Sequence, residues 1–254
     1  MFSPKKFEFQ KFIVNHSHLI FLLAQINLLN VNYTFKSRSD EREKSVFGIF
    51  HRKKKSFERD SLFYDELFRT GGHEGLYHVH YTESRYYPVW RRGAEIISSM
   101  DNPKVLDIGC GPGQFASLLH DTGITSYKGI DHSAVAIEMA RENVPQWAGH
   151  FTVNDVFEPD NYRGNATIVV LFEVLEHLEK DLNLLRMVPP GTSILFSVPS
   201  YGSASHVRHY KSEGKVEKRY KQVVDIILLE TFADCPEPGK TIYLVHGTIK
   251  PDKY

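Results

Sequence analysis

Hydrophobic runs of strand length alternate with amphipathic runs of helix length from Lys104 onward. The strand-like runs are rich in Val, Ile and Leu and alternate only weakly, which is typical of parallel strands covered by helices on both faces. The pattern therefore predicts an α/β fold built on a mostly parallel sheet. Strands are expected at 104–109, 127–131, 151–156, 167–174 and 193–200, and helices at 114–121, 133–143 and 175–187.

The last two hydrophobic runs, 223–232 and 241–250, have no helix between them. They are joined by the Pro/Gly turn "ADCPEPGK". A turn this short permits only antiparallel pairing, because a parallel return needs a crossover of about a dozen residues or more. Ahead of the sheet, short helices are expected at 61–68, where Gly71 and Gly72 follow, and at 87–100.

Composition and charge limit the classes of function. The 254 residues carry 31 Lys and Arg against 31 Asp and Glu, so an overall electrostatic attraction to nucleic acid is not expected. Residues 1–60 hold 12 of the basic and 6 of the acidic residues. The two cysteines cannot form a disulfide framework, which favours a reducing compartment such as the cytoplasm. The apolar segment 19–31 is too short for a transmembrane helix. It is interpreted as an amphipathic helix, with peripheral membrane contact beside the basic cluster 51–55 as the alternative.

A glycine-rich turn follows the first expected strand in "VLDIGCGPGQF", residues 105–115. In an open α/β sheet this is where a nucleotide-like ligand binds. The spacing is G-x-G-x-G rather than the G-x-G-x-x-G of dinucleotide sites. Asp107 precedes the first glycine, and its carboxylate would repel a pyrophosphate but attract a cationic amino-acid moiety. The spacing and the charge therefore favour a cofactor other than a dinucleotide.

This stretch resembles the first motif of the class I S-adenosylmethionine-dependent methyltransferases. The similarity continues in order through "YKGIDHS", "VNDVF", "LFEVLEHL" and "SILFSVPS", and it covers about residues 100–250. The resemblance implies a Rossmann-like, seven-stranded, mostly parallel sheet with an antiparallel last strand and helices on both faces. We place this domain at 71–254, after an N-terminal helical and charged arm at 1–70.

The resemblance also implies S-adenosylmethionine as cofactor and assigns residues to it. The methionine end would be held by the glycine loop, the ribose by the acid at the end of the second strand, and the adenine by the residues after the third. Phe172 would line the methyl-transfer cleft. The positions concerned are Asp107, Gly109, Cys110, Gly111 and Gly113 for the first group, Asp131 and His132 for the second, and Asp155 and Val156 for the third.

The segment "EVLEH" supplies the candidate catalytic groups. If the helix begins early, Glu173, Glu176 and His177 share one face at i, i+3 and i+4. With His206 or His209 they would resemble the metal site of the small-RNA 2′-O-methyltransferases. The metal-free interpretation is preferred here, because "EVLEHL" is also common in metal-free relatives that methylate small molecules. Glu173 and His177 are then the catalytic candidates, with His177 either a general base or a structural histidine.

Two further segments are candidates for the acceptor site. "SHVRHY" places His206 and His209 after the fifth strand. "YHVHYTESRYYPVW" brings Tyr81 and Tyr86 ahead of the core, either as a lid or as ordinary packing. The expected activity is methyl transfer to oxygen or nitrogen of a small-molecule or sugar-type acceptor. A metal-assisted RNA 2′-O-methyltransferase and a non-catalytic, cofactor-binding partner subunit are the alternatives.

Overall fold

The computed structural model describes residues 58–251. The predicted arm up to residue 57, with the apolar segment 19–31 and the basic cluster 51–55, lies outside the described residues. Within 58–251, no helix combines the length and the apolar character that crossing a membrane requires.

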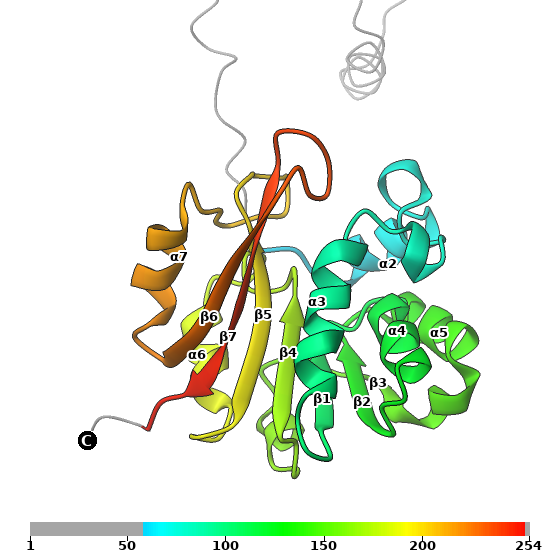
Figure 1. Ribbon diagram of the computed structural model, residues 1–254. Helices are drawn as coiled ribbons and strands as arrows, with labels where there is room; N and C mark the ends of the chain where they lie inside the picture. Colours follow the sequence, from blue (N-terminus) through cyan, green and yellow to red (C-terminus); the bar gives the residue numbers. More distant parts are fainter. Residues whose placement is uncertain (1–57, 252–254) are drawn as a thin grey trace, which may run out of the picture. The chain divides into compact units, whose positions relative to one another are not determined.

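Helices and strands alternate along the chain as the hydrophobic pattern predicts (Figure 1). The helices are α2 Ser61–Arg69, α3 Tyr87–Ser98, α4 Gln114–Asp121, α5 Ala134–Asn143, α6 Asp181–Met187 and α7 Glu213–Tyr220. The strands are β1 Lys104–Ile108, β2 Ser126–Asp131, β3 Phe151–Val153, β4 Ile168–Phe172, β5 Ser193–Pro199, β6 Val224–Ala233 and β7 Thr241–Ile249. Short 3₁₀ turns lie at His73–Gly75, Tyr81–Glu83, Pro145–His150 and Pro159–Tyr162.

The seven strands form one sheet in the order β3-β2-β1-β4-β5-β7-β6. Strands β1 to β5 run parallel, and β7 is antiparallel to both β5 and β6. The register pairs Asp107 of β1 with Gly129 of β2 and with Val170 of β4. The carboxyl ends of these three strands therefore meet at one edge, which is where an open α/β sheet binds its ligand.

Helices cover the sheet on both sides and create two hydrophobic cores (Figure 1). The first core includes Ile97 of α3, Leu119 of α4 and Ile137 of α5. The second includes Leu184 of α6 and Tyr220 of α7. Because both faces of the central strands are buried, their sequences read as continuous apolar runs, and the predicted fold class is confirmed.

Two expectations for helices differ from the structure. The helix predicted over 175–187 is wrong in its first half, since α6 begins only at Asp181. Glu173 has φ = 54°, a left-handed conformation that directs the chain after β4 into a turn instead of a helix. Helix α7 was not predicted at all, although Val216 and Tyr220 stand four residues apart and are both buried. The third strand ends at Val153, three residues earlier than expected.

Candidate active site

The glycine loop between β1 and α4 requires left-handed backbone at three positions. Gly109, Gly111 and Gly113 have φ of 71°, 52° and 79°, which other residues adopt only with strain. The loop is held against β2, because the N–H groups of Gly109 and Cys110 both donate to the carbonyl of Ile130, at 2.8 and 3.0 Å. The predicted ligand-binding turn is therefore formed by backbone groups, and its glycines leave room for a ligand to approach closely.

Asp131 links this loop to the start of α5. One carboxylate oxygen accepts a hydrogen bond from the Gly111 N–H and the other from the Ser133 N–H, each at 2.9 Å. Ser133 caps α5, as the sequence indicates, by accepting from the Ala136 N–H at 3.1 Å. Each carboxylate oxygen retains a lone pair, so Asp131 has the capacity to accept from two ribose hydroxyls as well.

Asp107 is buried at the end of β1 and accepts a hydrogen bond from the Tyr127 hydroxyl at 2.8 Å. Burial raises the pKa of Asp107 to about 7, and the nearby charge of Asp131 contributes in the same direction. A cationic ligand group beside this carboxyl would favour its ionised form. The two acids therefore present a site that suits a positively charged nucleoside.

The other predicted cofactor residues have different environments. The Cys110 thiol is buried in the first core, so only its backbone belongs to the loop. The His132 ring lies 4.9 Å from the Tyr64 ring, centroid to centroid. Asp155 is exposed and accepts from the Phe157 N–H at 2.9 Å, while the carbonyl of Val156 accepts from the Tyr162 hydroxyl at 2.6 Å.

Helix α2 packs over the glycine loop and the start of α5. Asp65 accepts hydrogen bonds from the Ser133 hydroxyl at 2.5 Å and from the Val135 N–H at 3.3 Å. Phe68 is buried and lies within van der Waals distance of a Cβ placed on Gly111. The Tyr64 ring stands between His132 and His177, with centroids 4.9 and 5.8 Å away. Sequence patterns identified this helix but gave no signal that it covers the site.

The strained turn after β4 begins with Glu173. Its N–H donates to the Ser197 hydroxyl at 3.0 Å, and that hydroxyl donates back to the Glu173 carboxylate at 2.8 Å. Burial raises the pKa of Glu173 to about 7. The neighbouring Phe172 packs edge-on against Phe115 of α4 at 4.6 Å. Strained backbone of this kind is found disproportionately at functional sites.

Glu176, His177 and His206 come together although they are not on a common helix. One potential ligand atom of each lies within 4.8 Å of the others. The His177 ring is 4.8 Å from the His206 ring, and its Nε2 is 3.7 Å from a Glu176 carboxylate oxygen. Burial lowers the pKa of His177 to about 3, whereas burial and the charge of Glu173 raise the pKa of Glu176 well above its usual value.

The predicted acceptor residues divide into two groups. The hydroxyls of Tyr86 and Tyr201 lie 3.1 Å apart, and His206 bonds the Tyr201 carbonyl through Nδ1 at 3.0 Å. These residues border the turn after β4. By contrast, Tyr81 donates its hydroxyl to Asp121 at 2.7 Å, which ties it to the end of α4, and His209 is exposed.

Tyr81 also lines a separate cleft of about 610 Å³ between the segment 77–81 and helices α4 and α5. Sequence reasoning missed Tyr64, Ser197 and Tyr201 near the site. Tyr77 belongs to the aromatic segment that was predicted as a possible lid, but no local pattern indicates which rings of that segment turn inward.

The site fits S-adenosylmethionine on its own chemistry. Left-handed glycines permit close backbone approach, Asp131 has acceptor capacity for a ribose, and Asp107 favours a cationic amino group. Comparison with known proteins agrees. The profile of a family described as "Methyltransferase domain" matches residues 81–239.

Two similar curated proteins are both ubiquinone biosynthesis O-methyltransferases. The chain is 27% identical over 128 residues to a ubiquinone biosynthesis O-methyltransferase of Thiobacillus denitrificans, covering 47% of this chain and 54% of that protein. It is 32% identical over 101 residues to the corresponding enzyme of Vibrio parahaemolyticus, covering 37% and 43%. The chain thus spans about half the length of the curated relatives it matches.

Solved structures share the fold. The N-methyltransferase NodS of Bradyrhizobium japonicum, in complex with S-adenosylhomocysteine, gives a TM-score of 0.55 at 17% identity over 74% of this chain and 98% of NodS. A putative methyltransferase in complex with the Trm112 activator of Haloferax volcanii gives 0.59 at 16% identity, covering 76% and 99%. The chain belongs to the class I S-adenosylmethionine-dependent methyltransferases.

Proposed function

We propose that this enzyme methylates an oxygen atom of a small-molecule acceptor, and that Glu173 accepts the proton which the acceptor loses. The O-methyltransferase names of the similar proteins support oxygen as the acceptor atom. The observation that carries the proposal is the position of Glu173. It directly follows β4 and lies beside the glycine loop, since a Cβ on Gly109 would strike Val174, the next residue, at 2.6 Å.

When bound, S-adenosylmethionine supplies its methyl group, so that a new C–O bond forms as the S–C bond breaks and S-adenosylhomocysteine is left. The chain's own task is to align the acceptor, exclude water and take up one proton. A group with a pKa near the working pH is the most effective base. The pKa of Glu173 is about 7, and Ser197 fixes the direction of its carboxylate. Glu173 is therefore better suited to this role than His177, whose pKa is about 3.

Helix α2 and the tyrosines would complete the reaction chamber. Phe68 covers the glycine loop, and Tyr64 stands between His132 and His177. The hydroxyls of Tyr86 and Tyr201 lie 3.1 Å apart and add polar groups to this aromatic wall. Aromatic walls suit a flat acceptor with one polar edge. We propose a phenolic compound as the acceptor class.

The test combines cofactor binding with turnover. S-adenosylhomocysteine binding is measured by calorimetry, and methyl transfer to a panel of mono- and dihydroxybenzoates is followed by mass spectrometry. Glu173→Gln should lower kcat by about 10²–10⁴-fold, the usual contribution of a general base, and leave cofactor affinity unchanged. The matched control is Glu179→Gln, an exposed glutamate on the same segment. Full activity of the Glu173→Gln enzyme would refute the assignment.

A further inference from the structure

We infer that Glu176, His177 and His206 bind one divalent transition-metal ion, and that Zn²⁺ matches this donor set best. The residues come from two segments, the turn after β4 and the loop after β5, and one ligand atom of each lies within 4.8 Å of the others. Two imidazoles and one carboxylate are a known catalytic zinc set, in which a fourth position stays open. This favours the metal alternative over the metal-free interpretation of the sequence.

The hydrogen bonds of both histidines leave Nε2 as the free ligand atom. Nδ1 of His177 lies 3.1 Å from the carbonyl of Ser205, and Nδ1 of His206 lies 3.0 Å from the carbonyl of Tyr201. A carbonyl only accepts, so each Nδ1 must carry the proton. The neutral ring then has its lone pair on Nε2. Fixing a histidine through a backbone carbonyl on its other nitrogen is the usual support for a metal ligand.

Glu176 provides the second, independent observation. Its side chain is 0% exposed, and within residues 58–251 neither carboxylate oxygen receives a hydrogen bond. Buried charged groups are normally paired or bound to a metal, because an unpartnered one is costly. The nearby cation, Arg208, is already engaged by carbonyl groups and by Asp181. The carboxylate of Glu176 therefore lacks a partner that a metal ion would supply.

The spacing of the ligand atoms is close to that of a tetrahedral site. Metal–ligand distances of about 2.0–2.1 Å place tetrahedral ligand atoms roughly 3.4 Å apart. His177 Nε2 and the nearer Glu176 oxygen are separated by 3.7 Å. All three ligand atoms lie within 4.8 Å of one another, so the wider pairs must approach by up to about 1.4 Å when an ion binds.

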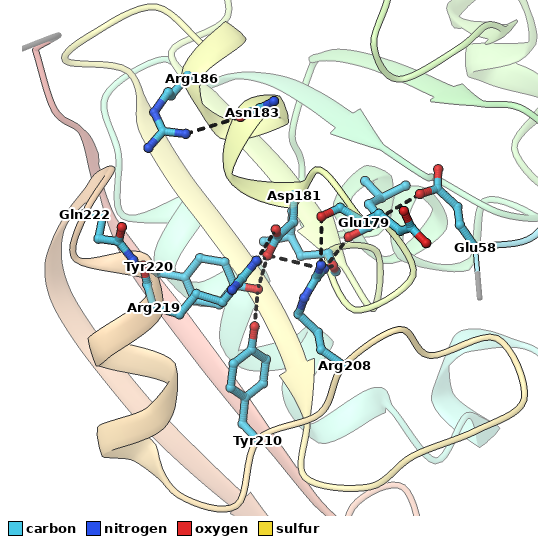
Figure 2. A network of polar contacts seen from close by, with 12 residues as sticks. Glu58, Glu179, Asp181, Asn183, Arg186, Arg208, Tyr210, Arg219, Tyr220 and Gln222 are labelled. Atoms are coloured by element: carbon cyan, nitrogen blue, oxygen red, sulfur yellow. Dashed lines mark hydrogen bonds and ion pairs between the residues drawn. The ribbon is translucent and has the colours of Figure 1, made fainter. Parts of the chain in front are cut away.

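The backbone that carries the three ligands is held rigidly. The N–H of Val207 donates to the Glu176 carbonyl at 2.8 Å, which ties the His206 loop directly to the turn. Arg208 extends from that loop and donates to the carbonyls of Leu175 and Leu178. It also donates to the carbonyl of Glu179 at 3.0 Å (Figure 2). It also pairs with Asp181 at 3.3 Å, the first residue of α6. The two segments therefore keep a fixed distance, as a preformed metal site requires.

The open coordination position would let the ion bind the methyl acceptor, an inference that rests on the proposed function. Glu173 stands at the start of the same turn, three residues before Glu176. A cation here would bind an oxygen of the acceptor, lower the pKa of its hydroxyl, and hold it within reach of Glu173. Acceptors with two adjacent oxygens would gain most, because both can contact the ion.

The experiment uses the full chain, stripped of metal with EDTA and dialysed. Zn²⁺ alone is titrated by calorimetry, and Co²⁺ is added to a second sample as a visible-absorption probe of coordination by nitrogen and oxygen. We expect one ion per chain. Glu176→Gln and His206→Asn should each weaken Zn²⁺ binding by at least about 10–100-fold, the loss that even outer-shell changes cause, and should remove the Co²⁺ bands. His209→Asn, an exposed histidine on the same loop, should retain both.

S-adenosylhomocysteine binding by every variant reports the fold and separates the two proposals. If the wild-type protein binds S-adenosylhomocysteine but no Zn²⁺, or binds Zn²⁺ equally in all variants, the metal site is refuted. If Zn²⁺ binding depends on Glu176 and His206 while no phenolic acceptor is methylated, the metal site stands and the proposed acceptor falls.

Discussion

Replacing Glu176 by Gln should stabilise the metal-free protein, although it alters a residue at the centre of the site. Both carboxylate oxygens of Glu176 are buried without a donor. The cost of such a group is about 1–3 kcal/mol, and more when it is charged. Gln has the same shape and no charge, so it removes the cost of holding a carboxylate at this buried position without a donor. The variant should therefore recover about 1–3 kcal/mol of unfolding free energy.

Thermal and urea unfolding of both proteins in EDTA at neutral pH measures this gain. For a domain of this size each kcal/mol shifts Tm by roughly 2–4 °C. With added Zn²⁺ the wild-type protein should become the more stable of the two. A ligand that binds only the folded state stabilises it, and only the wild-type protein is expected to bind the ion well. The control is Glu179→Gln, which removes an exposed charge and should change Tm little. Destabilisation of Glu176→Gln in EDTA would show that the carboxylate has a protein partner, and would refute the reasoning.

Three other changes test separate parts of the structure. Burial raises the pKa of Asp107 to about 7, the charge of Asp131 raises it further, and the hydrogen bond from Tyr127 lowers it. Because only the ionised carboxyl attracts the cationic ligand, S-adenosylmethionine affinity should fall roughly tenfold per pH unit below pH 7. The Asp107→Asn variant should bind S-adenosylmethionine weakly at every pH. Calorimetry of both proteins from pH 6 to 8 measures this difference in pH dependence. Arg208→Ala leaves the carbonyls of Leu175, Leu178 and Glu179 without this donor and should cost about 3 kcal/mol in urea unfolding. A loss below about 1 kcal/mol would show that these contacts do not stabilise the fold. Asp65→Ala removes two contacts of α2, so hydrogen exchange should accelerate at 61–69 and stay unchanged in the sheet.

Most of the fold follows from local sequence, and the reasons are visible in particular residues. Ser133 precedes an amphipathic run and caps α5 as expected, and the short turn after Ala233 does force antiparallel pairing of β6 and β7. Fully buried strands such as β4 carry unbroken apolar runs because both faces meet helices. Such features depend on neighbours within a few residues, as do the left-handed glycines that follow β1.

The candidate site depends on contacts that no local pattern encodes. The turn at Glu173 was predicted as helix because its residue spacing suits one, but hydrogen bonds with Ser197, 24 residues away, accompany a left-handed backbone there. His206 approaches His177 only because β5 ends beside β4. Tyr64 likewise reaches the site only because helix α2 packs against the start of α5. The residue types were predictable from sequence, whereas their convergence was not.

Burial of negative charge connects the cofactor side of the site with the acceptor side. Asp107 and Asp131 lie at the ends of β1 and β2, and Glu173 and Glu176 lie after β4, all four with pKa values raised chiefly by desolvation. Three of these carboxyls are buried and that of Glu173 is half-buried; together they destabilise the free protein, and cations offset that cost. A sulfonium nucleoside would meet the first pair and a divalent ion the second.

The two cations should therefore oppose each other's binding through the acids rather than through direct contact. Each cation lowers the negative potential that attracts the other, and the glycine loop adjoins the Glu173 turn at Val174. Zn²⁺ should weaken S-adenosylmethionine binding, and by linkage S-adenosylmethionine should weaken Zn²⁺ binding by the same factor. Because S-adenosylhomocysteine lacks the sulfonium charge, comparing it with S-adenosylmethionine in the same titration isolates the electrostatic part.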